Sequence, residues 1–545
     1  MSQCLLDINN LRIAYSTIHR ADDSNPSWAV DGVSFQLNTG EIMALVGESG
    51  CGKSTLGRAM MRLLPNQATV EGEARFQGKS IYDYSASALR RFRGEVVALV
   101  FQDPMTRLDP LMTIGDHCIE TLKAHQPHLS SSQAKEKALT ALATVKISPD
   151  RFNQYPHEFS GGMRQRVAIA LALLLEPKVI IADEPTTSLD VTIAGEILRE
   201  LTALCRERDM GLLLISHDLA MVAKYCDRIG VMYGGKMVEM GTVKDVIYSP
   251  KHEYTKSLLK AAFHLHHTEN QNQEEKKEEN KPLLELKNLQ KYYTISVNFI
   301  EQLLGKKSQF IKAVDDLNLN IWQGEILGLV GESGCGKSTL SRTILQLIRA
   351  TNGQVLWQGK DLTTLSRSQL RGLRREIQMI FQDPHACLNP MMTIGESIIE
   401  PLIIHQLGNK LENRQRVETM LQRVGLDPKE YYNRYPKELS GGQQQRVAIA
   451  RALITQPKLV ICDEPVSMLD ATVQAQVLEL MLELKQEFKL TYLFITHDLS
   501  VARFLCDRIA VMNGGKIVEL DVTEKIFNNP QHPYTKTLLA AAPTL

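Results

Sequence analysis

The sequence predicts an α/β fold that occurs twice, each copy with a mostly parallel core sheet, and two observations lead to this prediction. First, the nonamer Gly-Glu-Ser-Gly-Cys-Gly-Lys-Ser-Thr at 47–55 returns letter for letter at 331–339. Second, four shorter motifs recur at one offset of 280 residues (381 − 101 for the first). Such repetition predicts that both halves fold alike. The motifs are Phe-Gln-Asp-Pro at 101 and 381, Ser-Gly-Gly at 160 and 440, Asp-Glu-Pro at 183 and 463, and His-Asp at 217 and 497.

Short apolar runs that alternate with helical patterns support the α/β assignment. Residues 41–46 form a β-rich run that enters the first nonamer, and the chain from Ser54 onward has a helical pattern. Four later runs are continuously apolar, as in strands buried on both faces of a parallel sheet: 179–182, 212–215, 459–462 and 492–495. One apolar helix face lies between the strands of each half, formed by Ile193, Ile197, Leu201 and Leu204 and by Val473, Val477, Met481 and Leu484.

Length and composition predict two domains joined by a linker. A chain of 545 residues is too long for one core, and the duplication divides it into units of roughly 265 residues. We expect domains at 1–265 and 282–545. Residues 266–281 are polar throughout and cannot bury a core, so we expect a flexible linker there. These ~16 residues reach roughly 50 Å when extended, enough for the two domains to pair face to face.

Charge, cysteine usage and hydropathy restrict the class of protein. Lys plus Arg equals Asp plus Glu at 62 each, so the chain lacks the excess of basic residues that would indicate binding to nucleic acid. Nine cysteines lack CxxC spacing, and Cys51 and Cys335 lie inside the nonamers, which favours a reducing cytoplasm. The N-terminus does not resemble a signal peptide. The longest apolar run, 167–182, is interrupted by Glu176-Pro177-Lys178, so we expect a helix end and a strand rather than a membrane span.

Each nonamer matches the phosphate-loop pattern GxxxxGK(S/T). Its glycines allow successive N–H groups to face the β- and γ-phosphates, and the following helix adds its positive end. Lys53 and Lys337 supply a point charge for the γ-phosphate, whereas Ser54 and Ser338 offer a hydroxyl to Mg²⁺. The predicted ATP-binding residues here are Gly47, Glu48, Ser49, Gly50, Cys51, Gly52, Lys53, Ser54 and Thr55, with Gly331, Glu332, Ser333, Gly334, Cys335, Gly336, Lys337, Ser338 and Thr339.

Acidic residues and histidines that end the buried strands are the candidate catalytic groups. Asp183 and Asp463 close apolar strands, where a carboxylate can hold the Mg²⁺ shell. Glu184 and Glu464 follow directly and are placed to polarise an attacking water as general bases. An Asp-Glu pair is otherwise a solvated strand end, and a lone histidine is more often structural. Their duplication at strand ends favours the site, with His217 and His497 as sensors of the γ-phosphate.

The segments 160–166 and 440–446, Ser-Gly-Gly-Met-Arg-Gln-Arg and Ser-Gly-Gly-Gln-Gln-Gln-Arg, resemble the signature of ATP-binding cassettes (ABC) over both halves. The resemblance implies two ABC-type domains, each with an antiparallel β subdomain and an α-helical signature subdomain. It also implies head-to-tail pairing, in which each signature covers the ATP on the opposite phosphate loop. The implied residues are Ser160, Gly161, Gly162, Ser440, Gly441 and Gly442 for the signature, Gln102 and Gln382 near Mg²⁺, and Asp190 and Asp470 in the D-loop.

Two further features follow from the resemblance. Tyr15 and Tyr293 occupy the place of the aromatic residue that stacks on adenine, although a core or edge tyrosine is the alternative. In the first signature Met163 stands where the family usually has Gln. Met468, before the D-loop Asp470, stands where the family usually has a small residue. The segments 381–390 and 530–536 resemble the dipeptide, oligopeptide and nickel importer cassettes, and the whole chain resembles the fused pairs of microcin- or glutathione-linked importers. No cysteine follows Tyr534, so we expect no iron–sulfur cluster in a C-terminal extension.

The importer resemblance implies an ATPase peripheral to the cytoplasmic face of the membrane. It implies two transmembrane permease subunits, a solute-binding protein as an indirect partner, and no nucleic acid. Two alternatives stay open: a soluble tandem cassette that acts on ribosomes or nucleic acid, and an exporter ATPase. The first usually carries charged helical linkers, basic arms or zinc modules, and the second usually carries its own membrane segments; neither feature occurs in this sequence.

Overall fold

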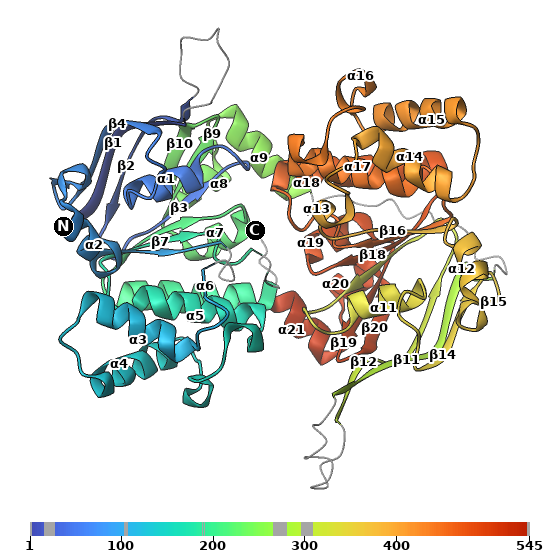
Figure 1. Cartoon of the computed structure of the whole chain (residues 1–545), viewed down its shortest axis with the longest axis horizontal. Helices are drawn as coiled ribbons and strands as arrows, with labels where there is room; N and C mark the ends of the chain where they lie inside the picture. The colour runs from blue at the N-terminus through green and yellow to red at the C-terminus, as the bar shows by residue number, and fades with distance from the viewer. Residues whose placement is uncertain are drawn as a thin grey trace. The chain divides into compact units, whose positions relative to one another are not determined.

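The computed structural model describes residues 3–15, 28–102, 107–187, 189, 191–264, 281–295 and 309–541. The chain divides into two compact units with the boundary between Ala262 and Phe263 (Figure 1). The predicted linker lies outside the described residues except for Lys281, and Asp190 lies outside them as well. The exact domain limits given above stay predictions.

A six-stranded sheet forms the centre of the first unit, in the order β10-β9-β3-β8-β7-β6. All its strand pairs are parallel except β9 with β10. Every residue of β3, β7 and β8 is buried, as the continuous apolar runs predicted. The strands are β3 (Ile42–Val46), β6 (Val97–Val100), β7 (Val179–Asp183), β8 (Gly211–Ile215), β9 (Arg228–Tyr233) and β10 (Lys236–Thr242).

A second, antiparallel sheet has the order β2-β1-β4-β5 and confirms the expected β subdomain. Helix α1 (Lys53–Met60) shares one apolar core with both sheets, because Leu56 and Met60 pack with Leu6 and Leu45. This packing fixes the start of α1 at the sheet edge. The strands are β1 (Cys4–Tyr15), β2 (Trp28–Asn38), β4 (Ala68–Phe76) and β5 (Lys79–Ser80).

Helices on the other side of the core sheet form the expected helical subdomain and share one apolar core with that face of the sheet. In this core Ile197 and Leu201 of α6 are buried, whereas Ile193 and Leu204 are half-buried. The apolar run 167–182 divides into the end of α5 and strand β7, as predicted. The helices of the first unit after α1 are α2 (Ala86–Arg91), α3 (Ile114–His125), α4 (Ser131–Thr144), α5 (Gly161–Leu173), α6 (Val191–Glu207), α7 (Leu219–Tyr225), α8 (Val243–Tyr248) and α9 (Glu253–His264).

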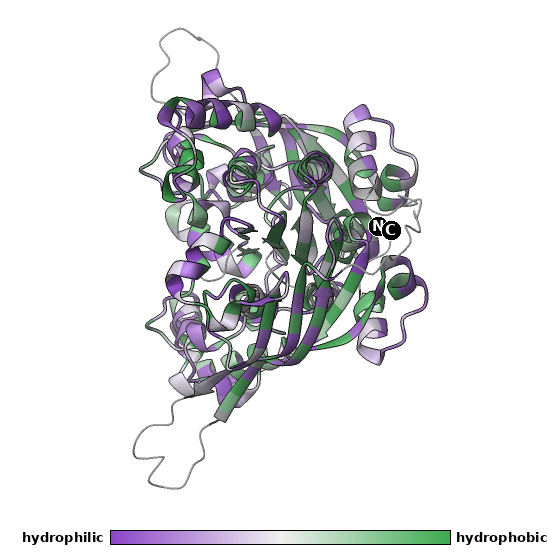
Figure 2. Cartoon of the chain, turned by 90° about the vertical axis from the view of Figure 1, so that its right-hand side faces the viewer, coloured by the Kyte–Doolittle hydropathy of each residue, from purple (hydrophilic) through white to green (hydrophobic). Residues whose placement is uncertain are grey.

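The second unit repeats this plan, with sheets β12-β11-β14-β15 and β16-β17-β18-β13-β19-β20. Figure 2 shows hydrophobic colour along its central strands and mixed colour on its outer helices. Its strands are β11 (Leu284–Ile295), β12 (Gln309–Ile321), β13 (Ile326–Val330), β14 (Asn352–Trp357), β15 (Lys360–Asp361), β16 (Ile377–Ile380), β17 (Leu459–Asp463), β18 (Thr491–Thr496), β19 (Arg508–Asn513) and β20 (Lys516–Val522). Its helices are α11 (Lys337–Ile344), α12 (Arg367–Leu373), α13 (Pro384–Cys387), α14 (Ile394–Ile404), α15 (Lys410–Arg423), α16 (Pro428–Tyr431), α17 (Gly441–Leu453), α18 (Ala471–Phe488), α19 (Leu499–Leu505), α20 (Thr523–Asn528) and α21 (Pro533–Ala541).

The topology brings the candidate site residues of each unit to one place. Strand β8 lies between β3 and β7, and the three run parallel, so their carboxyl ends share one edge of the sheet. The phosphate loop follows β3, Glu184 follows β7 and His217 follows β8 shortly after its end. Strands β13, β17 and β18 repeat the arrangement. Among the helices in the described part of the chain, none combines the length and the apolar character that a membrane crossing requires.

Candidate active sites

The phosphate loops need glycine for two physical reasons. Gly47 and Gly52 have φ of 147° and 100°, a region that L-residues rarely adopt. A Cβ on Gly47 would also lie 2.1 Å from the Met232 carbonyl oxygen, and one on Gly52 would lie 2.3 Å from the Ala29 carbonyl oxygen. In the second loop, Gly331 and Gly336 have φ of 154° and 112°, with corresponding distances of 2.2 and 2.0 Å to Met512 and Ala313.

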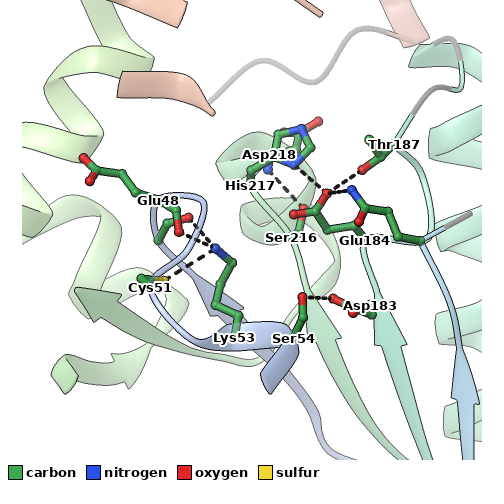
Figure 3. A network of polar contacts seen from close by, with 12 residues as sticks. Glu48, Cys51, Lys53, Ser54, Asp183, Glu184, Thr187, Ser216, His217 and Asp218 are labelled. Atoms are coloured by element: carbon green, nitrogen blue, oxygen red, sulfur yellow. Dashed lines mark hydrogen bonds and ion pairs between the residues drawn. The ribbon is translucent and has the colours of Figure 1, made fainter. Parts of the chain in front are cut away.

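Both loop lysines are buried, and Figure 3 shows that Lys53 points back over its own loop. Lys53 Nζ donates to the carbonyl oxygens of Gly47 (2.7 Å) and Glu48 (2.9 Å). Lys337 Nζ makes the same contacts with Gly331 (2.6 Å) and Glu332 (2.9 Å). In each loop one ammonium group therefore lies where the nonamer pattern predicts that phosphates bind.

A Ser–Asp pair lies beside each loop and offers the oxygen ligands that Mg²⁺ requires. Ser54 Oγ donates to Asp183 Oδ1 at 2.8 Å, and Ser338 Oγ donates to Asp463 Oδ1 at 3.3 Å. Burial raises the pKa of both aspartates, and the serine hydroxyl opposes that rise. Mg²⁺ prefers oxygen ligands from one or two protein groups together with substrate phosphates. The oxygens of these pairs fit such an ion.

The residue after each aspartate is held in a strained position. Glu184 and Glu464 have φ of 48° and 50°, which is unusual for a residue with a side chain. Each is fixed by its N–H, which donates to the carbonyl oxygen of Ile215 or Ile495 at 2.9 Å. The strain turns the glutamate side chain out of the strand and toward the space above the loop, as Figure 3 shows for Glu184.

The glutamate carboxylates meet donors from neighbouring strands. Glu184 Oε2 accepts from Gln102 Nε2 (2.7 Å) and Thr187 Oγ1 (3.0 Å) and lies 3.5 Å from His217 Nδ1. In the second unit Glu464 Oε2 accepts from Gln382 Nε2 (2.8 Å) and lies 3.1 Å from His497 Nδ1. Gln102 and Gln382 thus contact the glutamates, and their predicted contact with Mg²⁺ stays a prediction.

Electrostatics favour the ion-pair form of each Glu–His contact. Burial alone would raise the pKa of Glu184 and Glu464, but the hydrogen-bonding and charge interactions with His217 and His497 outweigh it, so both values lie below normal. Burial would likewise lower the pKa of the histidines, and the glutamates reverse the sign. An ionised glutamate of low basicity can orient and polarise a water molecule without removing its proton completely.

The charge on Glu464 should control the titration of His497. We expect His497 to titrate above its ordinary value of 6.5 and to titrate at lower pH in Glu464→Gln, measured by NMR of the imidazole signals. Stabilisation by the raised histidine pKa is complete below 6.5 and disappears as the pH rises through the folded value. Stabilisation by the lowered glutamate pKa is present above 4.5 and disappears at lower pH. Glu479→Gln, on the exposed face of α18, is the control; titration of wild-type His497 at or below 6.5 would disprove the pairing.

The two signature segments begin helices whose glycines face a neighbouring helix. A Cβ on Gly162 would lie 2.6 Å from Ile193 Cγ2, and one on Gly442 would lie 2.4 Å from Val473 Cγ1. Ser440 forms a capping box with Gln443, which Met163 cannot provide at the corresponding position of the first helix. The structure describes each signature within its own unit, and coverage of the opposite ATP stays a prediction.

The remaining predicted residues lie as follows. Tyr15 Oη donates to Thr55 Oγ1 at 3.3 Å, so this ring lies close to α1, and its side chain is 37% exposed. Tyr293 is 38% exposed, with Lys291 Nζ 5.1 Å from the ring centre. Both rings can be reached from solvent, and adenine stacking stays a prediction. Asp470 caps α18 through the Val473 N–H at 3.1 Å.

Three further side chains touch the site and were not predicted from the sequence. Thr187 contacts Glu184, whereas Tyr254 and Tyr534 contact the phosphate loops through the N–H groups of Glu48 and Glu332. A signal for the tyrosines was present, because each lies in a tail segment, His-Glu-Tyr-Thr-Lys or His-Pro-Tyr-Thr-Lys, that occurs in both halves. Nothing in the local pattern connects these tails to the loops.

Comparison with known proteins gives two kinds of match. The ABC transporter family model matches residues 30–187 and 314–467. A second model, the C-terminal region of oligopeptide/dipeptide transporters, matches residues 238–292 and 518–545. Each model matches twice, and together the matches include both loops, the ends of β7 and β17 and both tyrosine tails, whereas His217 and His497 lie outside the matched residues.

Glutathione import ATP-binding proteins are similar to this chain along almost its whole length. The glutathione import ATP-binding protein GsiA of Shigella boydii serotype 4 (strain Sb227) is 42% identical, with 99% of this chain and 89% of the relative covered. GsiA of Escherichia coli (strain K12) is 41% identical over the same shares. GsiA of Salmonella choleraesuis (strain SC-B67) is 41% identical, with 99% and 90% covered.

Proposed function

The chain belongs to the ABC transporter family, and from that membership we propose that it is the ATP-hydrolysing subunit of an importer for dipeptides, oligopeptides or a related small solute such as glutathione. One observation carries the proposal: each unit gathers a loop lysine, a Ser–Asp pair and a Glu–His pair at one edge of its sheet. The tail matches and the role of the relatives in glutathione import support the solute class.

The site residues divide the work of hydrolysis between them. The loop N–H groups and Lys53 or Lys337 bind the phosphates, and the lysine leaves its loop carbonyls for the γ-phosphate. Bound Mg²⁺, held by Ser54 and Asp183 or their counterparts, neutralises charge on the phosphate oxygens. Glu184 or Glu464 orients the attacking water. The glutamine and histidine beside each carboxylate keep it in place and ionised, so the geometry of the water depends on both.

Head-to-tail pairing of the two units completes each site in this proposal. Ser160 and Ser440 begin helices, and the start of a helix carries a positive partial charge with free N–H groups. Such an end suits the γ-phosphate held by the opposite loop. Two ATP molecules then close the pair, and hydrolysis followed by phosphate release opens it again.

Grooves beside α3 and β16 are the proposed docking places for two permease subunits. Leu111 and Met391 follow Gln102 and Gln382 by nine residues and are 84% and 82% exposed. Leu111 and Met112 line a cavity of 690 Å³ with Ile119 of α3, and Phe381 and Ile404 line one of 250 Å³ beside β16. A short apolar helix of each permease fits such surfaces. The chain then lies peripherally at the cytoplasmic face, and a binding protein delivers the solute to the permeases on the opposite side of the membrane.

Fractionation tests the proposed function against a role on ribosomes. The chain, mixed with vesicles that contain the two proposed permease subunits, is expected to hydrolyse ATP and to sediment with the vesicles. Replacing Leu111 and Met391 by aspartate should release it, because a charge in an apolar contact lacks a partner. Sedimentation with ribosomes, or equal binding to vesicles without permeases, would refute the importer role.

A further inference from the structure

A tyrosine from the tail of each unit holds the phosphate loop of the same unit. Tyr254 Oη accepts from the Glu48 N–H at 3.0 Å, and Tyr534 Oη accepts from the Glu332 N–H at 3.2 Å. The contacts join residues 206 and 202 positions apart. Tyr254 and Tyr534 lie in the segments that match the C-terminal region of oligopeptide/dipeptide transporters, whereas Glu48 and Glu332 lie in the ABC transporter matches.

The tyrosine and the loop lysine form hydrogen bonds with opposite sides of one peptide group. The peptide between Gly47 and Glu48 is trans, so its N–H and C=O point in opposite directions. Its N–H donates to Tyr254, and its C=O accepts from Lys53 Nζ at 2.7 Å. The peptide between Gly331 and Glu332 is held in the same way by Tyr534 and Lys337, the latter at 2.6 Å. Without the hydroxyl, one side of this plane loses its anchor.

The tyrosine is itself fixed by a short chain of contacts. Glu239 of β10 accepts the N–H groups of Lys251 (2.8 Å) and His252 (3.0 Å) before α9, and His252 Nδ1 accepts the Tyr254 N–H (3.1 Å). The second unit repeats each link within 0.1 Å. There Glu519 accepts from Gln531 (2.8 Å) and His532 (3.0 Å), and His532 Nδ1 accepts from the Tyr534 N–H (3.2 Å).

We propose that Tyr254 and Tyr534 are positioning residues that pre-order the phosphate loops, so that the tail region of each unit sets the affinity for nucleotide. The inference rests on the proposed ATPase function and deepens it. A loop whose peptide plane is already fixed loses less freedom when the phosphates bind, and binding is tighter for that reason. The hydroxyls touch the loop and no reacting atom, so they act on affinity and leave the chemical step unchanged.

Removal of the two hydroxyls tests the proposal in the full-length chain. For Tyr254→Phe with Tyr534→Phe, we expect the KM for ATP and the calorimetric Kd for MgADP to rise about three- to tenfold, the effect of one hydrogen bond per site. The kcat should stay within about twofold, because the hydroxyl is expected to stabilise bound ATP and the transition state equally. Hydrogen exchange at the Glu48 and Glu332 amides should accelerate while β7 and β17 keep their protection. Tyr248→Phe is the control, since Tyr248 lies at the end of α8 and is 71% exposed.

Several results would overturn the proposal. An unchanged Kd, a fall in kcat alone, or an equal change in the Tyr248 control would each show that the hydroxyls do not pre-order the loops. If the double variant does not fold, Glu239→Gln with Glu519→Gln loosens the same chain of contacts and must raise KM in the same way; a normal KM there refutes the proposal. A wild-type chain that binds MgADP without hydrolysing ATP would contradict the ATPase function instead.

Discussion

Exchanging Glu184 and Glu464 for glutamine is expected to lower ATP hydrolysis by roughly 10²–10⁴-fold while ATP stays bound. Glutamine fills the same space and can still accept from Gln102 or Gln382 through its carbonyl oxygen. It carries no charge, so it cannot polarise the attacking water as the ionised carboxylate does. The loop lysine and the Ser–Asp pair are untouched, and for this reason binding should survive.

Steady-state hydrolysis and calorimetric binding of ATP measure the two halves of this expectation. The matched control is Glu136→Gln with Glu479→Gln, two exposed helix carboxylates away from the site. We expect wild-type rates in the control. Hydrolysis at more than about a tenth of the wild-type rate in Glu184→Gln with Glu464→Gln would remove both glutamates from their catalytic role.

Alanine at Gly47 and Gly331 is expected to weaken ATP binding by about 100-fold or more. The new Cβ would lie 2.1 or 2.2 Å from a carbonyl oxygen of the neighbouring strand, and φ of 147° or 154° adds backbone strain. Backbone cannot yield as a flexible side chain can, so the loop itself must move. A displaced loop no longer aligns its N–H groups with the phosphates.

The same loops contain a matched control for this substitution. Gly50 and Gly334 also have positive φ, 82° and 83°, but nothing lies within 4 Å of a Cβ built on either. Alanine there costs roughly 1 kcal/mol of backbone strain without a collision. Calorimetry with ATP should therefore separate the two pairs by at least about tenfold. Equal losses in both pairs would show that backbone conformation, and not the close approach, determines the effect.

The sequence predicted the elements that depend on local pattern and repetition. The repeated nonamer predicted the loops. Continuous apolar runs predicted the buried strands β7, β8, β17 and β18, and helical spacing of apolar residues predicted the apolar faces of α6 and α18. In α6, however, Ile193 is only half-buried, and it lies against Gly162 at the beginning of α5.

Contacts that join distant segments could not be predicted from the sequence. Tyr254 reaches Glu48 across 206 residues, and only the folded path of β10 and α9 brings them together. The hydrogen bond from Gln102 to Glu184 spans 82 residues and depends on the adjacency of β6 and β7. The positive φ of Glu184 accompanies a hydrogen bond to Ile215 on β8, and the sequence pattern of one strand does not contain this contact.

The structure of Glu184→Gln with Glu464→Gln, trapped with ATP and Mg²⁺, tests the paired sites most directly. We predict that Ser160 Oγ then lies within hydrogen-bond distance of the γ-phosphate held by Lys337, and Ser440 Oγ within that distance of the γ-phosphate held by Lys53. A structure in which each triphosphate contacts residues of its own unit only would contradict the account.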